Sequence, residues 1–287
     1  MVKIGFADYY LDNWHANNYP RFLRDVIARM GYDARVTHAY GLHPSPAGVT
    51  NSQWCLQQNV TEASSMRELV DSVDAIMVIA ADDSSWHEEV CQLPLRSGKP
   101  VFVDKTFAPD VAAAKRMFAL AMEHNTPVFS SSAQRYCQDI LDWQAVHPEP
   151  PAFVSTVGPH SLENYAVHQL EPIVALMGTG VKRIKAFAVG DAVTQLILDY
   201  GGGRMASFMQ SPQPWAEFNF MVSDGSTGKR LVSDDGNFYH NLARAILDFF
   251  TRGILPVREE ETLEIVAIIE TALTARKNPD TWYPIQY

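Results

Sequence analysis

One lysine stands where a buried strand ends, in surroundings that could support acid–base chemistry. The segment GKPVFVDKTFAPD, residues 98–110, is typical of a strand followed by a loop into a helix, and Asp104 and Lys105 close the strand. A lysine at this position, partly removed from water, can act as an acid, a base or a donor to a substrate hydroxyl, because burial disfavours its charged form. Lys105 is therefore the first candidate catalytic residue. An exposed loop lysine beside Asp104 is the alternative.

A second candidate pair lies on a later helix. Residues 163–178, ENYAVHQLEPIVALMG, have helical spacing and end at Gly178. Residues four apart share a helical face, so Asn164 and His168 can point toward one ligand. Pro172 lacks an N–H group and leaves the His168 carbonyl without its usual helical donor. The alternative interpretation of His168 is a histidine packed in the core.

A third polar stretch, DNWHANNYP, covers residues 12–20. Its density of hydrogen-bonding side chains beside a tryptophan is typical of a pocket for a polar ligand such as a sugar, and makes His15 a candidate substrate-binding residue. The alternative is a helix start capped by Asn17 or Asn18, with Pro20 in the first turn. Capping explains one asparagine and leaves His15 without a role.

The first 132 residues alternate between strands and helices, which predicts a Rossmann-like, doubly wound parallel sheet. The expected strands are residues 2–7, 33–40, 74–81, 100–105 and 126–131, and the expected helices are 19–30, 66–73, 84–98 and 109–125. Ligands of such sheets bind outside the carboxyl ends of the strands, so the loops near Ala7, Ala81, Asp104 and Ser130 should line one cleft.

After residue 150 the pattern changes to strands joined by glycine-rich turns, with a helix before them at about 161–177 and helices after them. This pattern predicts an α+β fold with a mostly antiparallel sheet. The predicted domains are therefore 1–132, for a dinucleotide, and 133–287, for substrate binding and oligomerisation. The second domain would close the cleft.

Composition excludes several classes of partner. The chain has 287 residues, 47% of them apolar, and a net charge of −10 without a long run of lysine or arginine. These features argue against nucleic acid or an anionic membrane as partner and favour a small molecule. The absence of a signal sequence and of a long apolar segment predicts a cytoplasmic protein. The nine histidines have no metal-ligand spacing, so no metal site is expected.

Several segments, in this order, resemble the Gfo/Idh/MocA family of glucose–fructose oxidoreductases and inositol dehydrogenases. GKPVFVDKTFA resembles that family's GK-x-V-x-x-EKP-x-A motif, with Asp104 and Thr106 in place of glutamate and proline. VDAIMVIAADDSSWHEEV, PVFSSSAQRY and PVREEETLEIVAIIETALTA resemble its fourth strand, sixth strand and C-terminal helix. The helix motif D-x-G-x-H-x-x-D matches with His168 as the histidine and Asn164 in place of the aspartate.

The resemblance implies an oxidoreductase that acts on a sugar, cyclitol or related polyol with NAD or NADP, and that forms a homo-oligomer. Lys105 and His168 would share the substrate hydroxyl proton, and Asn164 would orient the substrate. The implied substrate-binding residues are His15, Trp86, Arg135, Tyr136, His160 and Glu163. The implied cofactor-binding residues are Ala7, Asp8, Tyr9, Ala81, Asp82, His87 and Asp104.

The dinucleotide-binding glycines are missing from this chain. The usual G-x-G-x-x-G turn lets the backbone approach a diphosphate, but residues 7–12 here read ADYYLD, and only Gly5 remains, inside the strand. The second strand continues as VTHAYGLH, without the acidic residue that binds a ribose. Either side chains of residues 8–18 hold the cofactor, or the site serves another ligand. A non-redox sugar lyase or epimerase and a sugar-sensing regulatory protein are therefore the alternatives.

Overall fold

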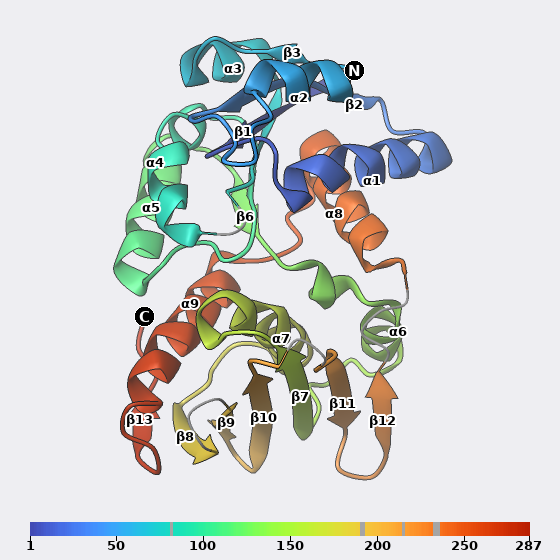
Figure 1. Ribbon diagram of the computed structural model, residues 1–287. Helices are drawn as coiled ribbons and strands as arrows, with labels where there is room; N and C mark the ends of the chain where they lie inside the picture. The colour runs from blue at the N-terminus through green and yellow to red at the C-terminus, as the bar shows by residue number, and fades with distance from the viewer. Residues whose placement is uncertain (81–82, 190–192, 214–215, 232–235) are drawn as a thin grey trace. The chain divides into compact units, whose positions relative to one another are not determined.

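The computed structural model describes residues 1–80, 83–189, 193–213, 216–231 and 236–287, which divide into two compact units (Figure 1). Unit 1 contains Met1–Ser131 and Leu242–Arg258, and unit 2 contains Ser132–Asn241 and Glu259–Tyr287. A segment from late in the chain therefore completes the first unit.

Unit 1 is built on a parallel sheet of six strands in the order β3-β2-β1-β4-β5-β6. The predicted Rossmann-like fold is confirmed. The central strand β1 pairs with β2 on one side and β4 on the other, so its carboxyl end lies at the point where the strand order reverses. The strands are β1 Val2–Asp8, β2 Ala34–Gly41, β3 Thr61–Glu62, β4 Ala75–Val78, β5 Val101–Val103 and β6 Val128–Ser130.

Most helices of unit 1 begin at polar caps. The Asn13 side chain accepts from the Ala16 amide at the start of α1, and Asp110 accepts from Ala113 at the start of α5. The helices are α1 Trp14–Met30, α2 Asn51–Gln58, α3 Met66–Ser72, α4 His87–Val90, α5 Val111–Glu123 and α8 Phe238–Arg252. Helix α8 belongs to unit 1 from Leu242 onward. Helix α1 starts five residues earlier than predicted, because Asn13 is the cap rather than Asn17 or Asn18.

The prediction of a single helix over residues 84–98 is wrong. This segment forms a 3₁₀ turn at Ser84–Trp86, the short helix α4, and a second 3₁₀ turn at Pro94–Arg96. Pro94 has no N–H group to continue a helical ladder, and it starts the second turn. The broken segment places Trp86 on a short turn directly after the β4 loop.

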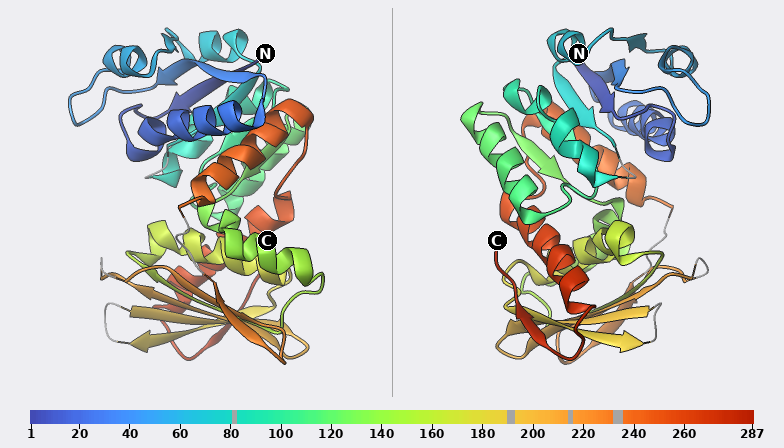
Figure 2. Two further views of the ribbon diagram at one scale, coloured as in Figure 1. Left: turned by 90° about the vertical axis from the view of Figure 1, so that its right-hand side faces the viewer. Right: turned by 60° about the vertical axis from the view of Figure 1, so that its left-hand side comes forward.

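Unit 2 has a seven-stranded sheet in the order β12-β11-β7-β10-β9-β8-β13, with helices packed on one face (Figure 2). The pair β7 and β10 is parallel and the other pairs are antiparallel, which confirms the mostly antiparallel sheet. The strands are β7 Phe153–Pro159, β8 Arg183–Val189, β9 Val193–Gly201, β10 Arg204–Ser211, β11 Asn219–Ser223, β12 Gly228–Leu231 and β13 Trp282–Pro284, and the helices are α6 Gln138–Val146, α7 Leu162–Met177 and α9 Glu259–Ala275.

Within the part of the chain that the structure describes, no helix has the length and apolar character needed to cross a membrane.

Gly5, the glycine that remains in β1, serves packing. A Cβ atom at this position would lie 3.0 Å from both the Leu69 Cδ1 and the Val73 Cγ2 atoms, which belong to α3 and its end. The absence of a side chain therefore lets α3 lie close against β1.

We expect Gly5→Ala to lower the free energy of unfolding by about 1–3 kcal/mol, because the added methyl overpacks the contact with α3. Urea unfolding followed by circular dichroism measures this loss. Lys3→Ala, on an exposed position of the same strand, should change the value by less than about 0.5 kcal/mol. Equal values for both variants would contradict the packing role.

Candidate functional site

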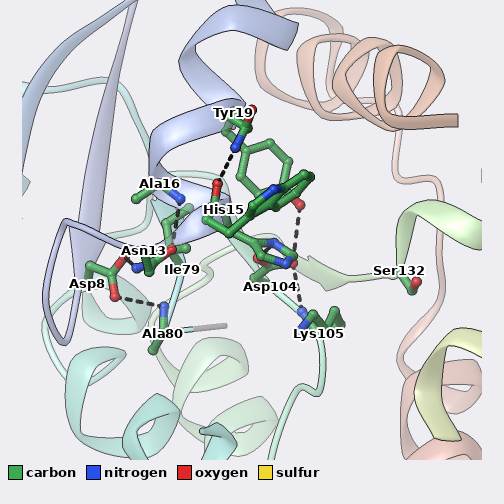
Figure 3. A network of polar contacts seen from close by, with 12 residues as sticks. Asp8, Asn13, His15, Ala16, Tyr19, Ile79, Ala80, Asp104, Lys105 and Ser132 are labelled. Carbon is green, nitrogen blue, oxygen red and sulfur yellow. Dashed lines mark hydrogen bonds and ion pairs between the residues drawn. The ribbon is translucent and has the colours of Figure 1, made fainter. Parts of the chain in front are cut away.

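The carboxyl end of β1 carries a buried carboxylate rather than a glycine turn. Asp8 is 1% exposed. Its Oδ1 atom accepts hydrogen bonds from the Tyr9 amide at 2.7 Å and the Ala80 amide at 3.1 Å, and its Oδ2 atom accepts from the Asn13 side chain at 2.7 Å (Figure 3). Ala80 follows β4, and Asn13 caps α1. One carboxylate therefore ties two strand ends to the start of a helix.

Ionisation of this carboxylate is unfavourable. Burial raises the pKa of Asp8 from 3.8 to about 7, and the nearby charge of Asp104 adds to the effect. The hydrogen bonds from Asn13, Tyr9 and Ala80 act in the opposite direction without cancelling it. Asp8 is therefore close to its titration midpoint at neutral pH.

A second buried carboxylate, Asp104, follows β5. Its Oδ2 atom lies 2.6 Å from the His15 Nδ1 atom, while its Oδ1 atom accepts from the Lys105 amide at 2.9 Å and the Tyr19 hydroxyl at 3.2 Å (Figure 3). His15 and Tyr19 lie one turn apart on α1. The carboxylate thus joins the first turns of α1 to the main chain of Lys105.

Asp104 remains ionised. Burial pushes the pKa of its carboxyl upward, but the charge and the hydrogen bond of His15, together with the charge of Lys105, outweigh burial and hold the pKa below its usual range. Lys105 itself is 7% exposed. The predicted candidates Lys105, Asp104 and His15 are therefore brought together in unit 1.

Beside Asp8 lies a cavity of about 120 Å³, lined by Asp8, Tyr9, Tyr10, Asn13, Ala80, Asp83 and Trp86. The Tyr9 ring stacks on Trp86 with centroids 4.0 Å apart, and the His43 ring meets Tyr9 edge-on at 4.8 Å. Aromatic rings and carboxylates thus surround the cavity, and no lysine or arginine is among these lining residues.

Two other predicted cofactor residues, Ala7 and His87, have different surroundings. Ala7 is fully buried in β1, where its carbonyl accepts from the Ile79 amide. His87 is also fully buried, with Nδ1 3.0 Å from the Phe107 carbonyl and Nε2 3.0 Å from the Ile79 carbonyl. Both ring nitrogens therefore face the protein backbone. Ala81 and Asp82 lie outside the described residues.

The turn after β1 does not fit the diphosphate of a dinucleotide in the usual way. The amides of Tyr9 and Ala80, which could hold a phosphate, already donate to Asp8, and the Ala16 amide donates to Asn13. Two phosphate charges would also meet the carboxylates of Asp8 and Asp83.

In unit 2, the candidate histidine is oriented by a serine that sequence analysis missed. The Ser132 Oγ atom lies 2.6 Å from the Nδ1 atom of His168. Ser132 is 1% exposed, whereas His168 on α7 is half-buried. This contact at Nδ1 helps to fix the orientation of the imidazole ring. The only sequence signal for Ser132 is its place two residues after the end of β6.

A buried ion network lies next to this pair. The Arg135 Nε atom is 2.6 Å from Glu171 on α7, and one of its terminal nitrogens is 2.8 Å from Glu261 on α9. Glu171 also accepts from the Ser132 amide at 3.1 Å. Arg135, predicted to bind substrate, is 8% exposed and holds two helices together.

The remaining predicted residues of unit 2 are more dispersed. Asn164 is exposed on α7, one turn before His168, and Glu163 pairs with Arg276 at 2.7 Å. His160 is exposed, and its ring lies 4.2 Å from the Tyr165 ring. Tyr136 is buried, and its carbonyl accepts from Asn241. Among the residues described, no cluster of three or more histidine, cysteine, aspartate or glutamate side chains could hold a metal ion.

The chain is similar to known oxidoreductases in sequence and in fold. Residues 21–132 match the Gfo/Idh/MocA family, described as an oxidoreductase family with an NAD-binding Rossmann fold. The Escherichia coli (strain K12) protein "Uncharacterized oxidoreductase YhhX" is 28% identical over 101 residues, which cover 35% of this chain and 28% of that protein. The aligned part thus spans little more than a quarter of this curated relative. The resemblance predicted from the sequence is confirmed.

Solved structures share the fold over nearly the whole chain. A probable dehydrogenase from Thermotoga maritima superposes with a TM-score of 0.82 at 13% identity, covering 99% of this chain and 98% of that one. An oxidoreductase from Agrobacterium radiobacter, in complex with NAD+, L-tartaric acid and magnesium, has a TM-score of 0.78 at 13% identity, covering 99% and 98%. The myo-inositol 2-dehydrogenase from Lactobacillus plantarum has a TM-score of 0.76 at 13% identity, covering 99% of both chains. The description of the matched family names NAD binding, but the β1 turn of this chain does not fit a diphosphate in the usual way.

Asp8 predicts a pH-dependent stability. Because its folded-state pKa of about 7 lies above the unfolded value near 3.8, the folded protein binds this proton more tightly, and the resulting stability is present in full below about pH 4 and is lost as the pH rises through 7. In Asp8→Asn this loss is absent. The stability of the variant relative to the native protein should rise by up to about 4 kcal/mol from pH 4 to pH 8.

Urea unfolding of both proteins across this range measures the difference. Asp104 does not interfere, because its lowered pKa acts below the usual aspartate range and is common to both proteins. A constant difference between the two proteins from pH 4 to pH 8 would show that Asp8 is ionised at the same pH in both states.

Arg135→Met should lower the free energy of unfolding by about 3–5 kcal/mol, because it leaves two glutamates without their cation in the core of unit 2. Arg183→Met, which removes a half-exposed ion pair with Asp199, should cost about 1 kcal/mol or less. Thermal and urea unfolding of both variants makes the comparison. Similar losses in the two variants would mean that the Arg135 network adds no more stability than a surface pair.

Proposed function

We propose that this protein is a Gfo/Idh/MocA-type oxidoreductase that acts on a sugar, a cyclitol or a related polyol. The single observation that carries the proposal is Lys105, which is buried at the carboxyl end of β5 and has its main chain held by the ionised Asp104. The carboxyl end of the parallel sheet is where ligands of this fold bind. A cationic side chain there suits a substrate that exposes hydroxyl groups.

The proposed role of Lys105 is proton transfer at the substrate hydroxyl. Oxidation of an alcohol removes the hydroxyl proton; the neutral amine of Lys105 can receive that proton, and the ammonium that results can stabilise negative charge on the substrate oxygen. Asp104, whose other carboxylate oxygen contacts His15, accepts a hydrogen bond from the Lys105 amide. NAD or NADP, the hydride carrier of the family, would supply the redox chemistry when bound, with its diphosphate held by residues other than those of the β1 turn.

His168 is the proposed second proton-handling residue. Its Nδ1 atom contacts the Ser132 Oγ atom, and an imidazole can serve as proton donor or acceptor. Asn164 shares that helical face and is exposed, which suits the orientation of a polar ligand. A carbohydrate-like small molecule is the proposed partner. Homo-oligomerisation and a cytoplasmic location stay predictions of the sequence.

A second function is favoured by one observation. The Asp8 carboxylate takes the donors that a cofactor diphosphate would use. A lyase or epimerase on the same fold needs an acid and a base but no hydride carrier, and Lys105 and His168 have the chemistry for both roles. The two functions differ in whether a nicotinamide changes its oxidation state during turnover.

Lys105→Met should reduce turnover at least about 100-fold, because the variant lacks the group that exchanges a proton with the substrate. The assay follows the absorbance of reduced nicotinamide with NAD and NADP over a panel of polyols, cyclitols and sugars. A parallel assay without nucleotide follows the same substrates by NMR. Lys115→Met, on the exposed side of α5, is the matched control and should retain activity.

Full turnover by Lys105→Met would contradict the role of the lysine. Conversion detected by NMR without nucleotide, with no change in nicotinamide absorbance in the other assay, would favour the lyase or epimerase. No conversion of any substrate by the native protein would contradict both catalytic functions.

A further inference from the structure

We propose that Asp8 determines what the turn after β1 can bind: its carboxylate occupies the place of a ligand phosphate, so this turn excludes phosphate groups and admits ligands without them. This inference rests on the proposed function in one respect: the nicotinamide cofactor of that function carries a diphosphate.

The hydrogen bonds of Asp8 are those that a bound anion would receive. Two backbone amides, of Tyr9 after β1 and Ala80 after β4, converge on Oδ1, and the Asn13 amide group donates to Oδ2. In a dinucleotide-binding fold, donors at this switch point and at the start of the following helix hold the ligand's diphosphate. Here the protein supplies the anion from its own strand.

The start of α1 is engaged in the same way. The Ala16 amide donates to the Asn13 side chain at 2.9 Å, and the Asn13 side chain in turn donates to Asp8. Asp12, on the same loop, accepts from Asn17 at 2.9 Å and Ser45 at 3.3 Å. A ligand phosphate would therefore have to break this chain of hydrogen bonds and approach a second carboxylate.

The cavity beside Asp8 is also unsuited to a dinucleotide. Its volume of about 120 Å³ is small against the roughly 300–1,000 Å³ of ligand pockets. The stacked rings of Tyr9 and Trp86 form part of its wall, and the second carboxylate on the wall, Asp83, adds negative charge. A small uncharged or cationic ring without phosphate suits such a wall better than an anion does.

The ionisation of Asp8 supports this assignment. Burial raises its pKa to about 7, so the site holds one negative charge only with difficulty. An additional diphosphate next to it would repel that charge at short range and in a medium of low dielectric constant. Phosphate binding therefore requires that Asp8 become neutral, move away or be replaced.

The experiment measures binding to the full-length protein by calorimetry with two probes that share the adenosine group. ADP-ribose carries a diphosphate and lacks nicotinamide, and adenosine carries no phosphate. Neither probe reports on redox activity, so the result does not depend on whether the protein turns over a polyol. In the native protein, ADP-ribose should bind no more tightly than adenosine.

Asp8→Asn removes the charge at nearly constant volume, and Asp8→Ser also frees the amides of Tyr9 and Ala80. At least one of these variants should bind ADP-ribose tenfold or more tightly than the native protein does, with adenosine unchanged. The matched control is Asp83→Asn, which removes a charge from the same cavity wall without freeing the turn, because an asparagine can still cap the Ser85 amide. Its affinity for ADP-ribose should rise by no more than threefold, because the variant weakens the repulsion but leaves the amides of Tyr9 and Ala80 bound to Asp8.

Micromolar binding of ADP-ribose by the native protein would overturn the proposal, whether or not the variants fold. An equal gain in Asp83→Asn would also overturn it, because general electrostatics rather than the occupied turn would then be responsible. If the variants gain affinity for ADP-ribose but the native protein never reduces a nicotinamide, the proposal on Asp8 stands and the redox function fails.

Discussion

A carboxylate buried at the end of a strand needs hydrogen-bond donors, and unit 1 meets this requirement at two strands. Asp8 is the last residue of β1 and accepts a hydrogen bond from the Asn13 side chain. Asp104 follows β5, and its carboxylate contacts the His15 ring. Asn13 and His15 stand at the cap and in the first turn of α1, so the start of this helix is held by both carboxylates. The turn that binds a diphosphate in related folds is thereby committed to contacts within the protein.

The two carboxylates differ in their electrostatic surroundings. Asp104 has the charges of His15 and Lys105 nearby and keeps a lowered pKa, while Asp8 has amide donors but no cation in its hydrogen-bond shell and has a pKa of about 7. Environments that push the pKa values of two carboxyl groups apart are common at sites of acid–base chemistry. In this protein the ionised member stands beside the candidate catalytic lysine.

Unit 2 uses a different solution for its buried acid. The Glu171 carboxylate accepts hydrogen bonds from the Arg135 guanidinium and from the Ser132 amide. The Ser132 hydroxyl contacts the His168 ring. One buried cluster therefore stabilises α7 and orients the histidine that this helix carries. The family motif has an aspartate where this chain has the exposed Asn164, and in this chain the contact at Nδ1 of the imidazole comes from Ser132.

The sequence by itself determined the parallel sheet, the second sheet, the position of Lys105 after β5 and the helix that carries His168. These features follow from hydrophobic periodicity and from glycine and proline positions, which act over short stretches of chain. Family motifs extended this to candidate residues.

Only the tertiary structure decided what those residues contact. The Asp8 carboxylate accepts a hydrogen bond from the Ala80 amide, 72 positions away in the sequence. The hydrogen bond between Tyr19 and Asp104 joins residues 85 positions apart, and the contact between Ser132 and His168 joins residues 36 positions apart. The segment from Leu242 joins unit 1 although it follows the strands of unit 2. Such contacts depend on which strands are neighbours and on the depth at which each side chain is buried, and local sequence patterns carry neither.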